Sequence, residues 1–262
     1  MELARFNAGN FSLMGNHEHM SAITSGNQLL AALQPQDMAV LKPLLQPLRL
    51  EADTVLFGHG DAVREVYFPC GPTLVAYMVD VDQAHAVATA IVGREGVIGG
   101  IVSHGRAPAF CRAVVQFPGP ALRMLTTDLE RAQQQYPQIR QLFSRYADCL
   151  LAQVFQSVAC NAVHSIEQRT AKWLLSAIDR TGDHMVPLTQ EQIAGMLGVG
   201  RSYVGRVMVA FKARGILETM RGKLRIHRLD ELKNISCGCD ARVREHFDEV
   251  LAGIYPERVH SA

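Results

Sequence analysis

The chain has 262 residues, enough for two domains, and carries a formal net charge of +1. Its apolar fraction of 48% and charged fraction of 19% are those of a globular protein, and no apolar run approaches the ~20 residues that span a bilayer. The amino terminus lacks the basic segment followed by an apolar stretch that marks a secretion signal. We therefore expect a soluble, cytoplasmic protein with no membrane partner.

The small net charge conceals an asymmetry along the chain. Residues 188–228 contain six Arg and two Lys against two Glu, a charge of +6, which leaves −5 for the rest of the chain. Phosphates attract such a basic segment, so the pattern is typical of a nucleic-acid-binding protein. An anionic lipid surface would attract it as well, and a solvated charged surface without a partner is the remaining interpretation.

The first half of the chain predicts an arm followed by a β-rich domain. Residues 1–26 are rich in Gly, Asn and Ser without a period and are expected to form a flexible arm. In "NQLLAALQPQDMAVLKPLL" the helical spacing is interrupted by Pro35, which predicts two short helices. Short β-rich runs with Gly, Pro and Asp turns follow from Leu48, and they predict an antiparallel barrel or sandwich as the sensor-like domain over 27–136.

A long helix is predicted over 137–162. Its apolar residues recur at intervals of three and four, which gives one continuous stripe along the helix. Such a stripe can pair with a second copy of the chain or be buried against the chain's own barrel. We assign the segment as a dimerisation helix with the contact residues Ile139, Leu142, Phe143, Tyr146, Leu150, Val154 and Ser157.

A helix-turn-helix motif is predicted within a domain over 163–235. Thr189 and Gln192 have the spacing of a capping box that begins a helix, and Gly198 permits a sharp turn before a second helix at about 200–214. Gly205 costs about 1 kcal/mol in a helix interior, so we expect this helix to approach a neighbour or the phosphate backbone there. The first turns of the second helix carry the predicted base contacts, Arg201, Ser202, Tyr203 and Arg206.

A basic β-hairpin is predicted over 216–227, with Gly222 in its turn. Beside a helix-turn-helix it is a wing, whose cations contact phosphates without reading the base sequence. The predicted phosphate contacts are Thr189, Gln190, Lys212, Arg221, Lys223 and Arg225. These motifs indicate double-stranded DNA as the partner. An enzyme is not expected, because no catalytic triad order, metal motif or nucleotide-binding loop stands out.

With these motifs the sequence resembles the Crp/Fnr family of bacterial transcription regulators over about residues 28–232. The match is clearest in "LTQEQIAGMLGVGRSYVGRVMVAFKARGIL" and "NAVHSIEQRTAKWLL". The resemblance implies an α+β chain with a cyclic-nucleotide-binding-like antiparallel β-barrel of the jelly-roll type, a long dimerisation helix and a carboxy-terminal winged helix-turn-helix. It also implies a homodimer on a palindromic operator, with RNA polymerase as a candidate further partner.

The predicted recognition helix departs from the family's R-E-x-x-x-R pattern. Arg201 and Arg206 match the two arginines, but Ser202 stands at the glutamate position. A carboxylate there accepts a hydrogen bond from cytosine N4, which Ser cannot replace with the same geometry. We therefore expect a half-site other than the TGTGA type.

The family's cyclic AMP anchors are absent from "VGREGVIGGIVSHGRAPAFCRAVVQ". Gly100 stands at the glutamate position and residues 107–108 at the Arg-Ser position. We expect no cofactor and no cyclic AMP binding, and we place a degenerate or altered effector pocket at Gly99, Gly100 and Arg106, with Arg106 and Glu95 as substitute charged groups. The alternative is a receptor for a cyclic nucleotide or another small molecule, in which DNA binding depends on that effector.

The six cysteines are scattered, which suits reduced structural thiols better than a disulfide framework. Cys237 and Cys239 in "CGC" are half of a zinc or iron–sulfur site, which needs four ligands, so we predict no metal site. His164 is either a pH-sensitive switch or a capping and packing residue. In "NHEH", His17 and His19 offer two imidazoles without further ligands. Residues 236–262 are expected to be a helical extension.

Overall fold

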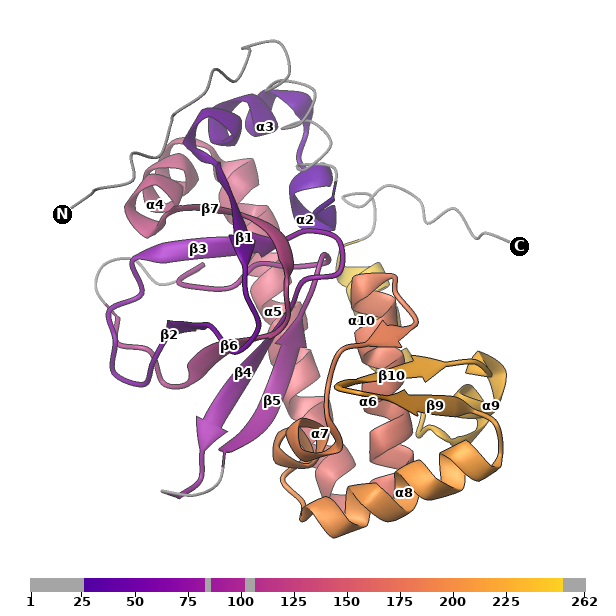
Figure 1. Cartoon of the computed structure of the whole chain (residues 1–262). Helices are drawn as coiled ribbons and strands as arrows, with labels where there is room; N and C mark the ends of the chain where they lie inside the picture. Colours follow the sequence, from indigo (N-terminus) through magenta and orange to yellow (C-terminus); the bar gives the residue numbers. More distant parts are fainter. Residues whose placement is uncertain (1–25, 83–85, 102–106, 252–262) are drawn as a thin grey trace, which may run out of the picture.

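The structure, a computed structural model, describes residues 26–82, 86–101 and 107–251. The expectations for the amino-terminal arm, for the histidines at 17–19 and for Arg106 lie outside these residues. Figure 1 shows a β-rich part and a helical part with its own small sheet, which lie side by side along the long helix α5 (Pro137–Val163).

The β-rich domain consists of two antiparallel sheets packed face to face. One sheet has the strand order β1-β7-β3 and the other β2-β6-β4-β5. The strands are β1 (Gln46–Leu50), β2 (Val55–Phe57), β3 (Glu65–Pro69), β4 (Leu74–Asp80), β5 (Ala86–Val92), β6 (Arg112–Phe117) and β7 (Gly119–Leu125). Tyr67 and Ala121 from the first sheet meet Val75, Val92 and Val115 from the second in one buried core. The predicted antiparallel β domain is confirmed.

Short helices cover one end of this domain. They are α2 (Gln28–Ala31), α3 (Pro35–Leu41), the 3-10 helix η1 (Lys42–Leu44) and α4 (Thr126–Gln135). Pro35 begins α3, where a missing backbone N–H costs no hydrogen bond. Asn27 is fully buried, and its polar side chain is satisfied there because it caps α2 and donates to the carbonyls of Pro69 and Gly96. The predicted pair of short helices is confirmed.

The first half of α5 packs inside its own chain. Ile139, Leu142, Phe143 and Tyr146 are at most 3% exposed and belong to a core that α4, β3 and β7 also line. Their assignment to a dimer face is wrong, because the chain's own β domain and carboxy-terminal helix already cover them. The alternative, burial against the chain's own barrel, holds for this half of the helix.

The second half of α5 is more open. The assigned residues Leu150, Val154 and Ser157 are half-buried. The apolar side chains that face solvent here are Leu151, Phe155 and Val158, with exposed fractions of 49%, 64% and 66%. The assignment of Leu150, Val154 and Ser157 to a dimer contact stays a prediction, and the exposed apolar residues lie beside them on the helix. Among the described helices, none is both long and apolar enough to cross a membrane.

The helical part contains the predicted winged helix-turn-helix. Its elements are α6 (Ile166–Thr181), β8 (Met185–Val186), α7 (Gln190–Leu197), α8 (Arg201–Ala213), β9 (Leu217–Met220), β10 (Lys223–Ile226) and α9 (Leu229–Ile235). Capping boxes at Ser165 and Thr189 begin α6 and α7. Left-handed Gly182 and Gly198 end the same two helices, so the chain turns sharply before α8.

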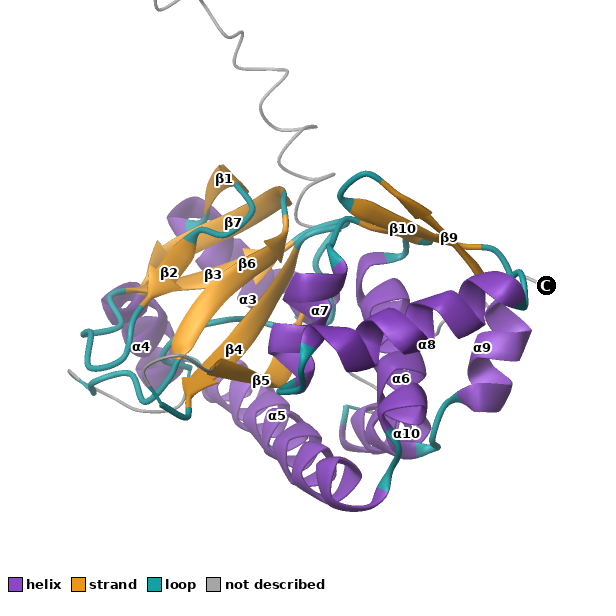
Figure 2. Cartoon of the chain, turned by 60° about the horizontal axis from the view of Figure 1, so that its bottom comes forward, coloured by secondary structure: helices purple, strands orange, loops and turns teal. Residues whose placement is uncertain are grey.

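The carboxy-terminal helix α10 (Cys239–Val250) contacts both α5 and α6. Its Val243 and Phe247 are buried in the core that includes Tyr146, and the Phe247 ring meets Tyr146 edge-on at a centroid distance of 6.3 Å. The helical part also packs on the outer face of the β4–β6 sheet, where Phe117 meets Trp173 at 6.4 Å. Figure 2 shows α7 against β5 at this junction.

Candidate nucleic-acid interface

The first turns of α8 present polar side chains to solvent and apolar side chains to the core. Arg201, Ser202, Tyr203 and Arg206 are all exposed. The opposite side of the helix is buried through Val204, Met208 and Phe211. Gly200 caps α8 in an extended conformation, directly after the turn at Gly198. The four predicted base-contact residues therefore share one accessible surface.

The two recognition arginines differ in how firmly they are held. The Arg206 guanidinium carbon lies 4.6 Å above the Tyr203 ring, a cation–π contact between residues one helical turn apart. Within the described part of the chain, neither Arg201 nor Arg206 has a carboxylate partner. Both cations are therefore available to an external acceptor, and the Tyr203 ring restricts the rotamers of Arg206.

The basic segment separates into internally paired and unpaired cations. Arg214 and Arg228 both bind Glu231, with Arg214 also 3.9 Å from Glu167, so these two charges are used inside the domain. Among the described residues, no carboxylate pairs with the predicted phosphate contacts Lys212, Arg221, Lys223 and Arg225. Arg225 lies opposite Glu218 in the hairpin register, which reduces the positive potential at that end.

The wing and the α7 cap have the predicted geometry. Strands β9 and β10 pair across the two-residue turn at 221–222, where Gly222 has a φ of 71°. Thr189 is exposed and its hydroxyl caps α7, while Gln190 is half-buried. A Cβ on Gly205 would meet only the Gln190 Oε1 atom, at 3.6 Å. A close neighbour within the chain therefore does not require glycine at 205, and approach to a phosphate backbone remains a prediction.

A pocket of about 200 Å³ opens where the effector pocket was predicted. Gly99 and Gly100 line it together with Tyr77, Phe110 and residues 107–109. None of the described lining residues carries a charge. The Gly99 amide faces the Tyr77 hydroxyl at 3.3 Å, so this backbone donor is already occupied. Burial raises the pKa of Tyr77, which keeps its hydroxyl protonated.

Glu95, the other predicted substitute anchor, does not face this pocket. Its carboxylate lies 3.1 Å from Arg180 Nε and accepts from the Gly93 amide. Both side chains are nearly buried at the junction between the β domain and α6, with 13% and 7% of Glu95 and Arg180 exposed. The role predicted for Glu95 in a ligand site is therefore wrong, because its carboxylate forms an ion pair with Arg180.

Arg180 also lies 3.7 Å from Asp240, which receives Arg244 at 2.6 Å and a hydrogen bond from Ser176. Burial raises the pKa of Glu95 despite Arg180. Burial acts on Asp240 in the same direction, but Arg180, Ser176 and Arg244 outweigh it and hold that pKa below its ordinary value. The Arg180 guanidinium, on α6, thus pairs with one carboxylate from the β domain and one from α10.

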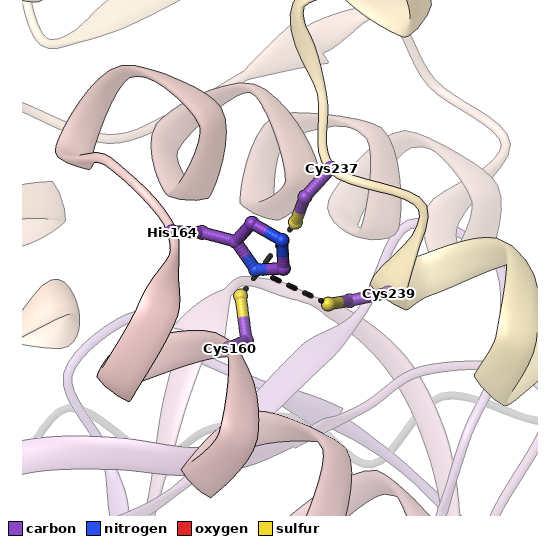
Figure 3. A group of neighbouring side chains, drawn as sticks. All are labelled: Cys160, His164, Cys237 and Cys239. Atoms are coloured by element: carbon purple, nitrogen blue, oxygen red, sulfur yellow. Dashed lines mark hydrogen bonds between the residues drawn. The ribbon is translucent and has the colours of Figure 1, made fainter.

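A second cluster lies next to this one, because Cys239 directly precedes Asp240. The fold brings Cys237 and Cys239 next to Cys160 and His164, from the end of α5 (Figure 3). Sequence reasoning found only the first pair and predicted no metal site on that ground. The signal for the other pair was the i, i+4 spacing in "CNAVH", which places two potential ligands on one face of a helix end.

Comparisons with known proteins agree with this geometry. Residues 168–235 match the model of the Crp-like helix-turn-helix domain. The structure of FixK2 from Bradyrhizobium japonicum is similar with a TM-score of 0.62 and 17% identity, over 74% of this chain and 98% of that one. The CLP regulator of Xanthomonas campestris, described as c-di-GMP responsive, gives 0.60 and 14%, over 74% and 99%.

A CRP-family transcriptional regulator from Thermus thermophilus, TTHB099, gives a TM-score of 0.60 and 16% identity, over 72% of this chain and 96% of that one. No curated protein sequence matches the chain. At these identities the solved structures establish a shared fold, and the domain match establishes the helix-turn-helix within it.

Proposed function

We infer that this Crp/Fnr-type transcription regulator, with its helix-turn-helix DNA-binding domain, works as a homodimer that reads a palindromic DNA operator. The observation that carries this inference is the exposed surface on the first turns of α8. There Arg201 and Arg206 stand without carboxylate partners among the described residues, and an arginine can hold guanine O6 and N7 through two hydrogen bonds. The recognition helix α8 enters the major groove and the β9–β10 wing lies along the phosphates.

A homodimer is supported by the exposed apolar face on the second half of α5. Leu151, Phe155 and Val158 follow one another at intervals of four and three residues, so they form one stripe on the helix surface. Burying this stripe against a second copy would remove the apolar surface from water. A two-fold pair of α8 helices would then face half-sites about 34 Å apart.

The effector pocket supports a regulator that does not respond to cyclic AMP. A cyclic phosphate needs charge-assisted hydrogen bonds, and the described walls at Gly99, Gly100 and Tyr77 offer none. The second candidate function is a receptor for another small molecule, since a pocket of about 200 Å³ is present. Calorimetry with cyclic AMP and cyclic GMP tests the first assignment, and tight binding of either nucleotide would contradict it.

The DNA-binding roles are tested with three variants on a selected operator and on random duplex, at one stated salt concentration. Arg201→Ala and Arg206→Ala should each lose about 1 to 3 kcal/mol on the operator and little on random DNA, because a base contact is removed. Lys223→Ala should weaken both duplexes by the same factor and reduce the salt slope by about one, because only a phosphate contact is removed.

Arg214→Ala is the matched control, because its guanidinium is already paired with Glu231 and Glu167. It should change operator affinity less than Arg201→Ala, although both variants remove one arginine from α8 or its end. Equal losses in Arg201→Ala, Arg206→Ala and Lys223→Ala on both duplexes would reject the division between base and phosphate contacts.

A further inference from the structure

We propose that Cys160, His164, Cys237 and Cys239 form a closed, four-coordinate site for one zinc ion. Three thiol sulfurs and one imidazole nitrogen lie within 4.8 Å of one another. Three cysteines and a histidine are a donor set of structural zinc sites. Nothing in the DNA-binding function requires these four residues to meet.

Two distances between ligand atoms match the edges of a tetrahedron around a single metal ion. Zinc bonds of about 2.3 Å to sulfur and about 2.0 Å to nitrogen give tetrahedral edges of about 3.8 Å between sulfurs and about 3.5 Å between sulfur and nitrogen. The Cys160 and Cys237 sulfurs are 3.6 Å apart, and the Cys239 sulfur is 3.5 Å from His164 Nδ1. Figure 3 shows all four ligand atoms converging on one small volume.

A disulfide, an iron–sulfur cluster and simple packing each fit the geometry less well than zinc does. A disulfide needs a sulfur separation of about 2.05 Å, well below the 3.6 Å between Cys160 and Cys237. In an iron–sulfur cluster the ligands bind different irons and therefore spread further than one ion can reach. Small apolar residues would fill the same space, but they would not bring an imidazole nitrogen to a thiol.

One of the four ligands already has an outer-shell hydrogen bond. The Gln156 side-chain amide donates to the Cys239 sulfur at 3.1 Å, an outer-shell hydrogen bond that orients the ligand. Cys239 is also the first residue of α10, so the helix fixes its backbone at the edge of the cluster. Cys160, Cys237 and Cys239 are buried and His164 is half-buried, so solvent competes little for the ion.

All four positions are filled by protein, which leaves no place for a reactant, so the ion is structural. It joins the end of α5 and the turn at His164 to the segment that begins α10. The metal therefore fixes the connection between α5 and the DNA-binding domain.

The test measures zinc in the full-length, tag-free chain purified under reducing conditions. The wild type should hold one zinc per chain, and Cys237→Ser and His164→Ala should lose it. Cys149→Ser is the matched control, because Cys149 is buried on the same α5 outside the cluster. His164→Cys should retain zinc, since four ligands remain.

Equal zinc content in Cys237→Ser and Cys149→Ser would overturn the proposal, as would iron with inorganic sulfide or a Cys160–Cys237 disulfide in place of metal. If the variants do not fold, cobalt-loaded wild type replaces them. An intense tetrahedral spectrum with thiolate-to-cobalt charge transfer supports the site, and a weak octahedral spectrum overturns it. Operator binding is measured separately, so a failure of the proposed DNA-binding function can be distinguished from a failure of the zinc site.

Discussion

Replacing Arg180 by Met removes the cation that joins the buried carboxylates of Glu95 and Asp240. The three side chains are 7%, 13% and 10% exposed, so water compensates little for the lost charge. Removing one partner of a buried ion pair costs about 3 to 5 kcal/mol, because the remaining buried carboxylates lose a compensating positive charge. We expect a loss of this size in the free energy of unfolding for Arg180→Met.

The assay is urea denaturation of both proteins at pH 8, followed by far-ultraviolet circular dichroism. Arg112→Met is the control, because Arg112 pairs with Asp80 on the surface, where the side chains are 35% and 47% exposed. An exposed pair contributes about 0 to 1 kcal/mol. If Arg180→Met costs no more than Arg112→Met, the buried cluster does not stabilise the fold and the reasoning fails.

The pH dependence gives a second check on the same variant. The lowered pKa of Asp240 stabilises the wild type above the unfolded value of about 3.9, and this contribution is lost as pH falls through the lower folded value. The raised pKa of Glu95 has the opposite effect on stability. Because burial disfavours the charged form of Glu95, this carboxyl destabilises the folded wild type as pH rises above the unfolded pKa.

Without Arg180 both carboxyls take up protons more readily, and protonation removes the buried charge. The difference in stability between wild type and Arg180→Met should therefore be smaller at pH 5 than at pH 8. A difference that does not change with pH would mean that Glu95 and Asp240 are not the source of the loss.

Two further predictions concern α5 and α8. Phe155→Asp, at a side chain 64% exposed, should leave the unfolding free energy within about 0.5 kcal/mol but convert the proposed dimer to a monomer in light scattering. Ser144→Asp, at an exposed polar position of α5, is the control and should leave the dimer intact. An unchanged mass of the Phe155→Asp variant would place the interface elsewhere. Gly205→Ala should stabilise the chain by about 1 kcal/mol in thermal unfolding, since its Cβ meets only Gln190 at 3.6 Å. A fall in DNA affinity of that stabilised variant would indicate that the phosphate backbone approaches residue 205, and a loss of stability would contradict the prediction.

The winged helix-turn-helix was predictable because its signals are local. The Thr189 capping box, left-handed Gly198 and the Gly222 turn each act within a few residues, and the structure has all three. The first turns of α8, where the sequence placed the base contacts Arg201 and Arg206, are likewise exposed. Where the chemistry of a turn or cap fixes the backbone, the sequence alone is sufficient.

The α5 prediction failed in part because a periodic stripe does not name its partner. Ile139 and Phe143 are as apolar as an interface would require, yet the chain's own core takes them. The exposed Leu151, Phe155 and Val158 lie on a different face of the same helix. Only the tertiary arrangement distinguishes the two surfaces.

The cysteine cluster could not be predicted because its two halves lie far apart in the sequence. Cys160 and Cys237 are separated by 77 residues. Each half alone offers two ligands, which is too few for a metal site. The fold of α10 against α5 and α6 creates the set of four, and the packing of Phe247 on Tyr146 holds α10 there.

Strand β4 shows how the pocket and the DNA-binding domain share one element. Successive residues of a strand point to opposite faces, so Tyr77 lines the pocket while its neighbours Ala76 and Met78 pack in the core of the helical part. Glu95, at the end of the following strand, ties the same sheet to Arg180. Any ligand that displaced Tyr77 would therefore act on the sheet against which α6 and α7 pack.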